Sequence, residues 1–96
     1  MFKCDIPKYI TLNEYGSVLA GNLTAMSIRY AIQDCKGSVI LDFKGVRTVS
    51  LTFADELLGV LAEKLGSEEF FKKIKLINIS DTNRKVCLYV VGERLT

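Results

Sequence analysis

The chain has 96 residues, of which 49% are hydrophobic and 25% are charged. This length and composition are typical of one folded domain with a single hydrophobic core, and they exclude an intrinsically disordered chain. The formal net charge of +2 gives no reason to expect nucleic-acid binding. We therefore expect a single domain over residues 1–96.

The sequence shows no segment for export or membrane insertion. Residues 1–7 lack the apolar stretch of a secretory signal. The longest wholly apolar run, residues 86–91, is too short to span a bilayer. The three cysteines, Cys4, Cys35 and Cys87, are odd in number and far apart, which indicates reduced and mostly buried thiols. These features predict a cytoplasmic protein.

The first part of the chain is predicted to form a β-hairpin. Apolar positions alternate over residues 2–12 around Pro7, which indicates an edge strand or two short strands. Turn-forming residues at 13–16 then lead to a second strand at 17–19. A hairpin is the simplest arrangement of these two segments.

A helix is expected after the hairpin. Its apolar stripe consists of Ala25, Ile28, Ala31, Ile32 and Cys35. Gly37 is expected to end this helix, and Asn22 or Thr24 to cap its start. Arg29 is expected to point into solvent.

Residues 38–43 are predicted to form the central strand. They are apolar and rich in β-branched residues, and Gly37 and Gly45 bound them, which is typical of a strand covered on both faces. Asp42 is the polar exception. We expect its carboxylate to accept hydrogen bonds from loop amides at the end of the strand.

The next helix is expected to begin near Phe53 and to end at Gly66. Thr52 occupies the expected N-cap position, with Asp55 as the acid of a shortened capping box. At 100° per residue, an apolar arc faces the core: Phe53, Ala54, Leu57, Leu58, Val60, Leu61 and Leu65. The opposite arc, expected to face solvent, contains Asp55, Glu56, Gly59 and Glu63. A glycine in an exposed helix interior is unfavourable, so its presence suggests either tolerance or a close approach by another backbone.

The last third of the chain is predicted to hold a short helical turn, a strand and a final element. Residues 67–73 form the turn with Phe70 and Phe71 on the core, and residues 74–79 form the strand. A cap signal at residues 80–83 precedes the apolar segment 86–91. That segment is β-branched enough for a strand, whereas the cap favours a helix.

The alternation of strands and helices predicts an α/β fold, with a mixed sheet of about four strands and helices packed on it. In such folds, sites form beyond the carboxyl ends of strands, where loops meet helix N-termini. Residues 50–55 occupy such a position.

The sequence lacks the residues that most catalytic sites need. It contains no histidine, which removes Ser-His-Asp and Cys-His arrangements and most zinc sites. It also lacks the glycine-rich motifs that hold phosphates. We therefore expect no enzyme activity, no cofactor and no metal site.

Charge is distributed unevenly along the chain. Residues 52–70 carry five acids and one lysine, whereas residues 71–96 carry six basic and two acidic residues. This contrast suits docking or self-association, but solvated helix faces are the favoured interpretation.

One stretch resembles a known family. It has an apolar strand ending in Asp42-Phe43, then Gly45-Val46, then Thr52-Phe53-Ala54-Asp55-Glu56-Leu57. This pattern is similar to that of the STAS-like domains of unknown function, small relatives of the anti-sigma factor antagonists. The glycines at 16 and 21, Ala25 and the strand at 74–79 also fit. The resemblance implies a regulatory module whose partner is a histidine-kinase-type ATPase, and it favours a helix over residues 86–91.

The resemblance also implies where a partner binds. In the anti-sigma factor antagonists the corresponding loop carries Asp-Ser-Ser-Gly, and an ATPase-fold kinase phosphorylates one of the serines. Here residues 50–53 stand in that place, without the Asp and the Gly. The expected partner-binding residues are Thr52, Asp55, Glu56, Gly59 and Glu63, with Ser50 and Thr52 as candidate phosphorylation sites. The simpler interpretation of Thr52 is a helix cap without any role in binding.

Two alternatives remain open from the sequence. The first is an assembly module whose edge strand, within residues 2–12, pairs with a second copy in a homodimer or with another chain. The second is small-ligand binding in the loop crevice, which rests on fold-level analogy alone.

Overall fold

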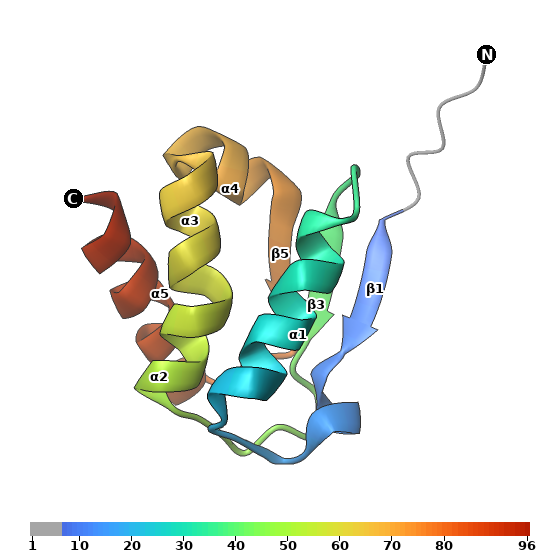
Figure 1. Cartoon of the computed structure of the whole chain (residues 1–96). Helices are drawn as coiled ribbons and strands as arrows, with labels where there is room; N and C mark the ends of the chain where they lie inside the picture. Colours follow the sequence, from blue (N-terminus) through green and yellow to red (C-terminus); the bar gives the residue numbers. More distant parts are fainter. Residues whose placement is uncertain (1–6) are drawn as a thin grey trace.

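The computed structural model describes residues 7–96, in which two parallel sheets and a set of helices enclose one core (Figure 1). The strands are β1 (Lys8–Thr11), β2 (Val18–Leu19), β3 (Val39–Asp42), β4 (Thr48–Val49) and β5 (Ile74–Ile77). The helices are the 3-10 turn η1 (Leu12–Tyr15), α1 (Asn22–Gln33), α2 (Leu51–Ala54), the π-helical segment η2 (Asp55–Gly59), α3 (Val60–Leu65), α4 (Ser67–Lys73) and α5 (Asp81–Leu95).

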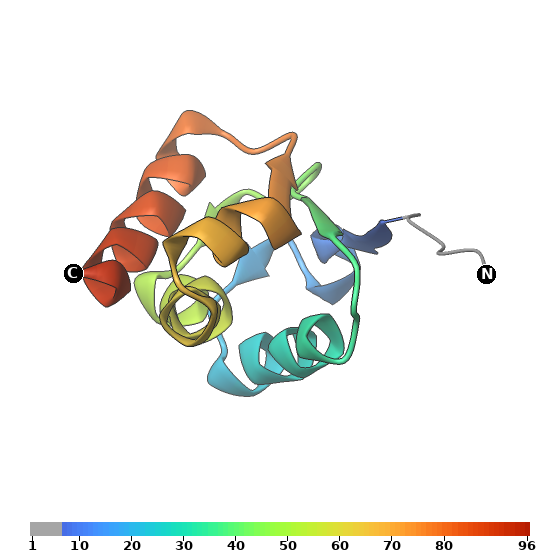
Figure 2. The same cartoon turned by 90° about the horizontal axis from the view of Figure 1, so that it is seen from above.

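The larger sheet has the strand order β1-β3-β5, with both pairs parallel. Its register aligns Ile10 with Leu41 and Leu41 with Leu76. Val39 and Leu41 of β3 are fully buried, which confirms residues 38–43 as the central strand. The helices lie on one side of this sheet, however, and Ile40 is only half-buried on the other side (Figure 2). The prediction that both faces are covered is therefore wrong for the described residues.

The predicted hairpin and the predicted single mixed sheet are also wrong. β1 pairs with β3, and β2 pairs with β4 in a separate two-stranded sheet. The turn-forming residues do not reverse the chain, because they wind into η1 and bury Leu12 completely. β2 is thereby directed away from β1. Residues 2–6 of the predicted edge strand, and Cys4, lie outside the described part of the chain.

α1 follows its predicted apolar stripe only in part and does not have its predicted ends. Ala25, Ile28 and Ile32 are buried, but Ala31 is exposed. The helix ends at Gln33, before Cys35 and the predicted end at Gly37. The N-cap position is Gly21, and no side chain bonds to the first amides of the helix. The predictions for Asn22 and Thr24 are therefore wrong, because the helix has already begun at Asn22.

α2, η2 and α3 form one continuous helix with a change of pitch in the middle. The core arc is confirmed, since Phe53, Leu57 and Leu61 are each 1% exposed. In η2 the Val60 amide bonds to the Asp55 carbonyl, five residues back, which is the π-helical pattern. This wider turn shifts the angular phase of the residues that follow. Val60 and Leu65, which were predicted to face the core, are therefore only half-buried, whereas Ala62 is fully buried. Gly66, with φ of +84°, ends the helix as predicted.

The C-terminal part confirms the predicted order. β5 follows α4, and the Ser80 side chain accepts a hydrogen bond from the Asn83 amide at 3.2 Å to cap α5. The segment 86–91 is helical, as the cap indicated. Phe70 is 4% exposed, but Phe71 is 48% exposed, so only one of the two phenylalanines is in the core.

Candidate protein-interaction site

The second long helix begins at a different residue from the one predicted. The Ser50 Oγ accepts a hydrogen bond from the Phe53 amide at 3.0 Å, which makes Ser50 the N-cap. The Ser50 amide also donates to the Leu19 carbonyl at 2.9 Å, so the cap is attached to the end of β2. Thr52 lies inside the first turn and is exposed. Its predicted capping role, and that of Asp55 as a capping-box acid, are therefore wrong.

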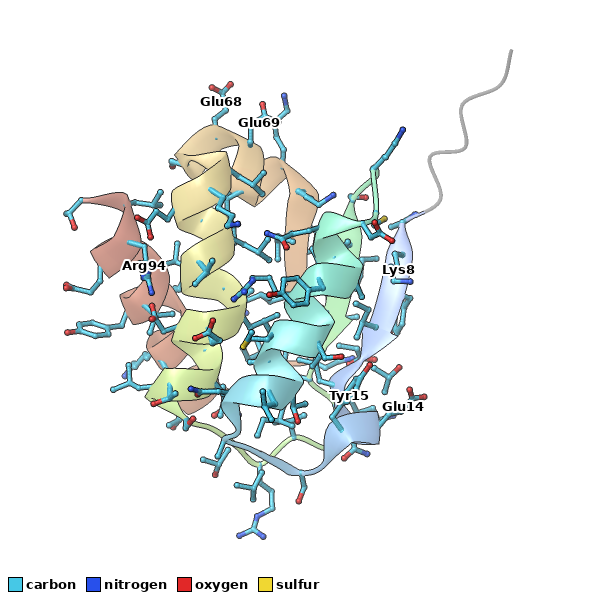
Figure 3. All side chains as sticks on the ribbon, in the orientation of Figure 1. Lys8, Glu14, Tyr15, Glu68, Glu69 and Arg94 are labelled. Carbon is cyan, nitrogen blue, oxygen red and sulfur yellow. The ribbon has the colours of Figure 1, made fainter. Side chains whose placement is uncertain are left out.

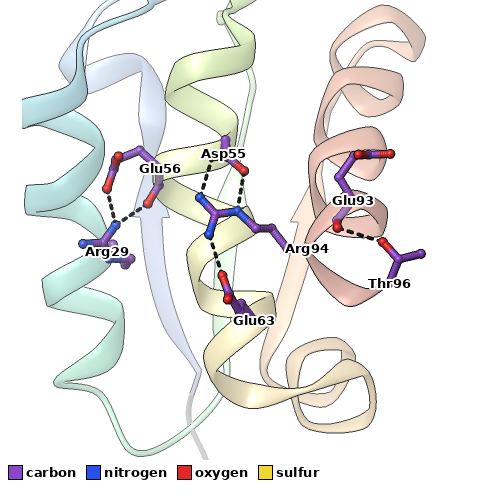
Figure 4. A network of polar contacts seen from close by, with 7 residues as sticks. All are labelled: Arg29, Asp55, Glu56, Glu63, Glu93, Arg94 and Thr96. Atoms are coloured by element: carbon purple, nitrogen blue, oxygen red, sulfur yellow. Dashed lines mark hydrogen bonds and ion pairs between the residues drawn. The ribbon is translucent and has the colours of Figure 1, made fainter.

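Two of the predicted partner-binding acids already have a partner inside the chain (Figure 4). Arg94 near the end of α5 donates from Nε to Asp55 Oδ1 at 3.0 Å and from Nη2 to Asp55 Oδ2 at 2.8 Å. Its Nη1 donates to Glu63. The hydrogen bonds from Asp55, and then those from Glu63, raise the pKa of Arg94 above its ordinary value. These contacts within the molecule thus pair part of the acidic segment of the sequence with part of the basic segment.

The third acid, Glu56, is held by α1. Arg29 donates from Nη1 to the Glu56 carboxylate at 2.8 Å and also to the Glu56 backbone carbonyl. The Arg29 side chain is 7% exposed, so the expectation of a solvated arginine is wrong. The reason is the packing of α1 against η2, which closes over Arg29 and leaves its Nε without a hydrogen-bond partner.

Gly59 is buried rather than exposed, and a side chain, not another backbone, explains the glycine. A Cβ atom built at this position lies 2.3 Å from Asp55 Oδ1 and 3.1 Å from Arg94 Cγ. Only glycine leaves room for the Asp55 carboxylate to fold over the helix and meet Arg94. The predicted open acidic arc is therefore an internal junction between η2, α3 and α5, with Glu63 exposed at its rim.

The exposed surface beside this junction combines the start of α2 with one face of α5. Leu51 is 54% exposed and Tyr89 is 59% exposed. With Thr52 and Glu93 they border a shallow hollow of about 340 Å³. We call Leu51, Thr52, Tyr89 and Glu93 the α2–α5 surface. Sequence reasoning missed Leu51, Tyr89 and Glu93, although a helix over residues 81–95 places Tyr89 and Glu93 one turn apart on the same face.

Asn83 attaches α5 to β4 and so positions this surface. Its side chain is buried, with Oδ1 accepting from the Val49 amide at 3.2 Å and Nδ2 donating to the Arg47 carbonyl at 3.3 Å. A buried amide with both ends bonded holds its two elements at a defined separation.

Asp42 has the structural role that the sequence predicted. Its carboxylate accepts from the Lys44 amide at 2.9 Å, from Asn78 Nδ2 at 2.9 Å and from the Tyr9 hydroxyl at 2.6 Å. The Tyr9 hydrogen bond, followed by those from Asn78 and Lys44, lowers the pKa of Asp42, and the same contact raises the pKa of Tyr9. These bonds join Asp42 at the end of β3 to Tyr9 within β1 and to Asn78 just after β5. The Lys44 side chain is exposed.

Residues 7–96 contain no cluster of three histidine, cysteine, aspartate or glutamate side chains placed to hold a metal ion. Within the same residues, no helix is both long and apolar enough to cross a bilayer.

A family model described as the STAS-like domain of unknown function (DUF4325) matches residues 26–84, which is more than half of the chain. The chain belongs to this family. The family match of this STAS-like domain includes the start of α2, all of η2 and α3, and β5. It ends before Tyr89, Glu93 and Arg94, so the α5 side of the junction lies outside the matched range. No curated protein and no solved structure matches this chain.

Proposed function

We propose that this STAS-like domain is a non-catalytic regulatory module that docks a histidine-kinase-type ATPase through the α2–α5 surface. The observation that supports this proposal most directly is the pair of large exposed side chains, Leu51 and Tyr89, on either side of Thr52 at the rim of one hollow. Surface hydrophobic residues scattered singly are ordinary, but paired anchors around a hollow are typical of protein contact sites.

The proposal keeps the predicted loop and moves the docking surface toward α5. Thr52 stays in the surface. Asp55, Glu56, Gly59 and Glu63 become supports, because their contacts with Arg94 and Arg29 hold η2 and α3 against α5 and α1. The carboxylates of Asp55 and Glu93 border the hollow, so the fitting partner presents apolar groups with a basic residue near them.

Phosphorylation of the loop is a second part of the proposal. The Thr52 side chain is exposed, whereas the Ser50 hydroxyl is occupied as the helix cap. A phosphate on Thr52 adds about two negative charges beside the apolar side chains of Leu51 and Tyr89, and the cost of desolvating them would weaken the apolar contact with the partner. Incubation with the partner ATPase and ATP, followed by intact mass, should show one phosphate that Thr52→Ala removes and Ser50→Ala retains. Absence of any mass increase would exclude the switch.

The docking surface is tested by affinity capture of a candidate histidine-kinase-type ATPase. We expect the double substitution Leu51→Asp with Tyr89→Asp to abolish capture, because it places two charges at the proposed apolar contact. The matched control is Tyr15→Asp, which makes the same change from an exposed tyrosine to aspartate at a different place. Tyr15 is 50% exposed on η1, away from Arg94 and α5 (Figure 3). Circular dichroism should show both variants folded. Capture that is unaffected by the double substitution would refute the proposed surface.

Assembly through β1 is a second candidate function that one observation favours. β1 is an edge strand of the larger sheet and pairs only with β3 within residues 7–96, and its Tyr9 is 55% exposed. A free strand edge can pair with a second copy of the chain. Light scattering separates the two candidates, because a mass that stays monomeric over a wide concentration range counts against assembly.

A further inference from the structure

A second hollow lies on the side of the molecule formed by α4, β5 and α5. Its volume is about 340 Å³, and most of its lining is apolar. Cys87 forms part of its buried floor, while Phe71 and Leu88 stand at its sides with 48% and 49% of their surface exposed. We call this hollow the β5–α5 groove. It is separate from the α2–α5 surface, and the two share no lining residue.

One wall of the groove is a strand whose outer edge is free. β5 is the last strand in the order β1-β3-β5 and pairs only with β3 within the described residues. The Ile77 carbonyl accepts from the Phe43 amide, so the backbone groups of Ile77 point toward β3. Backbone groups of successive residues in a strand point to alternate edges. The amide and carbonyl of Leu76, which lines the groove, therefore point to the free edge.

The charges that line the groove have one sign. Lys75 on β5 and Arg84 on α5 line it from opposite walls, and no acidic residue lines it. Nearby acids do not neutralise them, because neither Lys75 nor Arg84 takes part in an ion pair among residues 7–96. An occupant must therefore offer apolar side chains to the floor and negative charge to the walls.

We infer that the β5–α5 groove binds an extended peptide segment of a partner protein in which apolar and acidic residues alternate. The peptide adds to the sheet as a fourth strand beside β5 and bonds to the free amide and carbonyl of Leu76. Its side chains alternate in direction, so the apolar ones enter the groove on the side of Leu76 while the acidic ones lie on the side of Lys75. The charge of Arg84 on the α5 wall adds to the attraction for an acidic peptide. The single strand edge, the apolar floor and the two unpaired cations thus select one kind of ligand.

Fluorescence anisotropy with labelled hexapeptides tests this inference. One library alternates Asp or Glu with Val, Ile, Leu or Phe, and a second replaces every acid with Lys. We expect saturable binding of the acidic library with dissociation constants below about 1 mM and no measurable binding of the basic library. Lys75→Glu with Arg84→Glu should weaken binding at least about tenfold, and Leu88→Asp by a similar factor. The control, Leu51→Asp with Tyr89→Asp, should leave peptide binding unchanged.

Amide hydrogen exchange gives a readout specific to strand addition. The bound peptide should slow exchange at the Leu76 amide, which points to the free edge, while the amides of α1 are unaffected. All substituted residues are exposed or partly exposed, and thermal unfolding confirms that each variant is folded before it is used.

Several results would overturn the inference. Equal binding of the acidic and basic libraries would remove the role of Lys75 and Arg84. Peptide binding without protection of Leu76 would remove strand addition. Saturable binding of decanoate with no binding of either library would assign the groove to a small amphiphile, and no binding of any probe would leave the groove without this function. None of these results tests the α2–α5 surface, so they neither support nor refute the proposed docking of the ATPase.

Discussion

Replacing Gly59 with alanine should not stabilise the native chain, but it should stabilise a chain that also carries Asp55→Ala. Alanine in a helix interior is normally favoured over glycine by about 0.5–1 kcal/mol. At position 59 this gain competes with a collision, because the new Cβ lies 2.3 Å from Asp55 Oδ1. The carboxylate must turn away and lose its two hydrogen bonds from Arg94.

The size of the loss follows from the exposure of the ion pair. The Arg94 and Asp55 side chains are 34% and 38% exposed, so solvent screens their attraction. Pairs of this kind contribute up to about 1 kcal/mol. Displacing Asp55 from its rotamer adds about 0.5–1.5 kcal/mol. Gly59→Ala should therefore leave the native chain between about unchanged and 2 kcal/mol less stable.

The prediction is tested by urea unfolding of a double-mutant cycle. In an Asp55→Ala background the collision with the carboxylate is absent, and Gly59→Ala should become stabilising by about 0.5–1 kcal/mol. Gly92→Ala in α5 is the matched control, because a Cβ there meets nothing within 4 Å. It should stabilise both backgrounds equally. Gly59→Ala that stabilises the native chain as much as Gly92→Ala would refute the reasoning.

Three further predictions concern buried polar and thiol groups. Arg29→Met should lower the free energy of unfolding by about 2 kcal/mol because it leaves a half-buried glutamate unpaired, whereas Arg47→Met, on an exposed loop, should change it by less than about 0.5 kcal/mol in urea titrations. The pKa of Asp42 is lowered in the fold, chiefly by the Tyr9 hydroxyl, so its stabilisation is present above the unfolded-state pKa and is lost as pH falls through the folded-state pKa. The stability difference between the native chain and Asp42→Asn should thus be full at neutral pH and shrink below about pH 4 in acid unfolding. Burial raises the pKa of Cys87 to about 12, so mass spectrometry should find this thiol unmodified by iodoacetamide at pH 8 until urea unfolds the chain.

The elements that the sequence predicted well are those with strong local signals. The central strand, the core arc from Phe53 to Leu61 and the capped α5 each combine apolar periodicity with a clear boundary residue. Asp42 was also predicted correctly, because a lone carboxylate at a strand end has few partners other than loop amides.

What the sequence did not reveal depends on contacts between distant residues. Strand pairing is one example, since nothing local distinguishes a β1–β2 hairpin from the observed pairs of β1 with β3 and β2 with β4. The candidate site is another. The π-helical turn shifts the helix phase and buries Gly59. Arg94 reaches the acids from α5, although it lies 39 residues after Asp55 in the chain. A regular 100° wheel cannot show either feature.

In the structure, the acidic residues of the candidate site have a different role from the one that the sequence predicted. On a regular helix, Asp55 and Glu63 were expected to meet a partner, and in the fold they hold α5 in place. The exposed surface that we propose for docking is instead bordered by Leu51 and Tyr89. The loop signal in the sequence lies at the same end of the helix as this proposed surface.

The most direct test of the proposed function is the hydrogen-exchange footprint of the histidine-kinase-type ATPase on this STAS-like domain. Docking through the α2–α5 surface predicts slower exchange in peptides that cover residues 50–54 and 87–93, with no change in β1 or η1. A complex that forms while both of these segments exchange at the rate of the free domain would contradict the account.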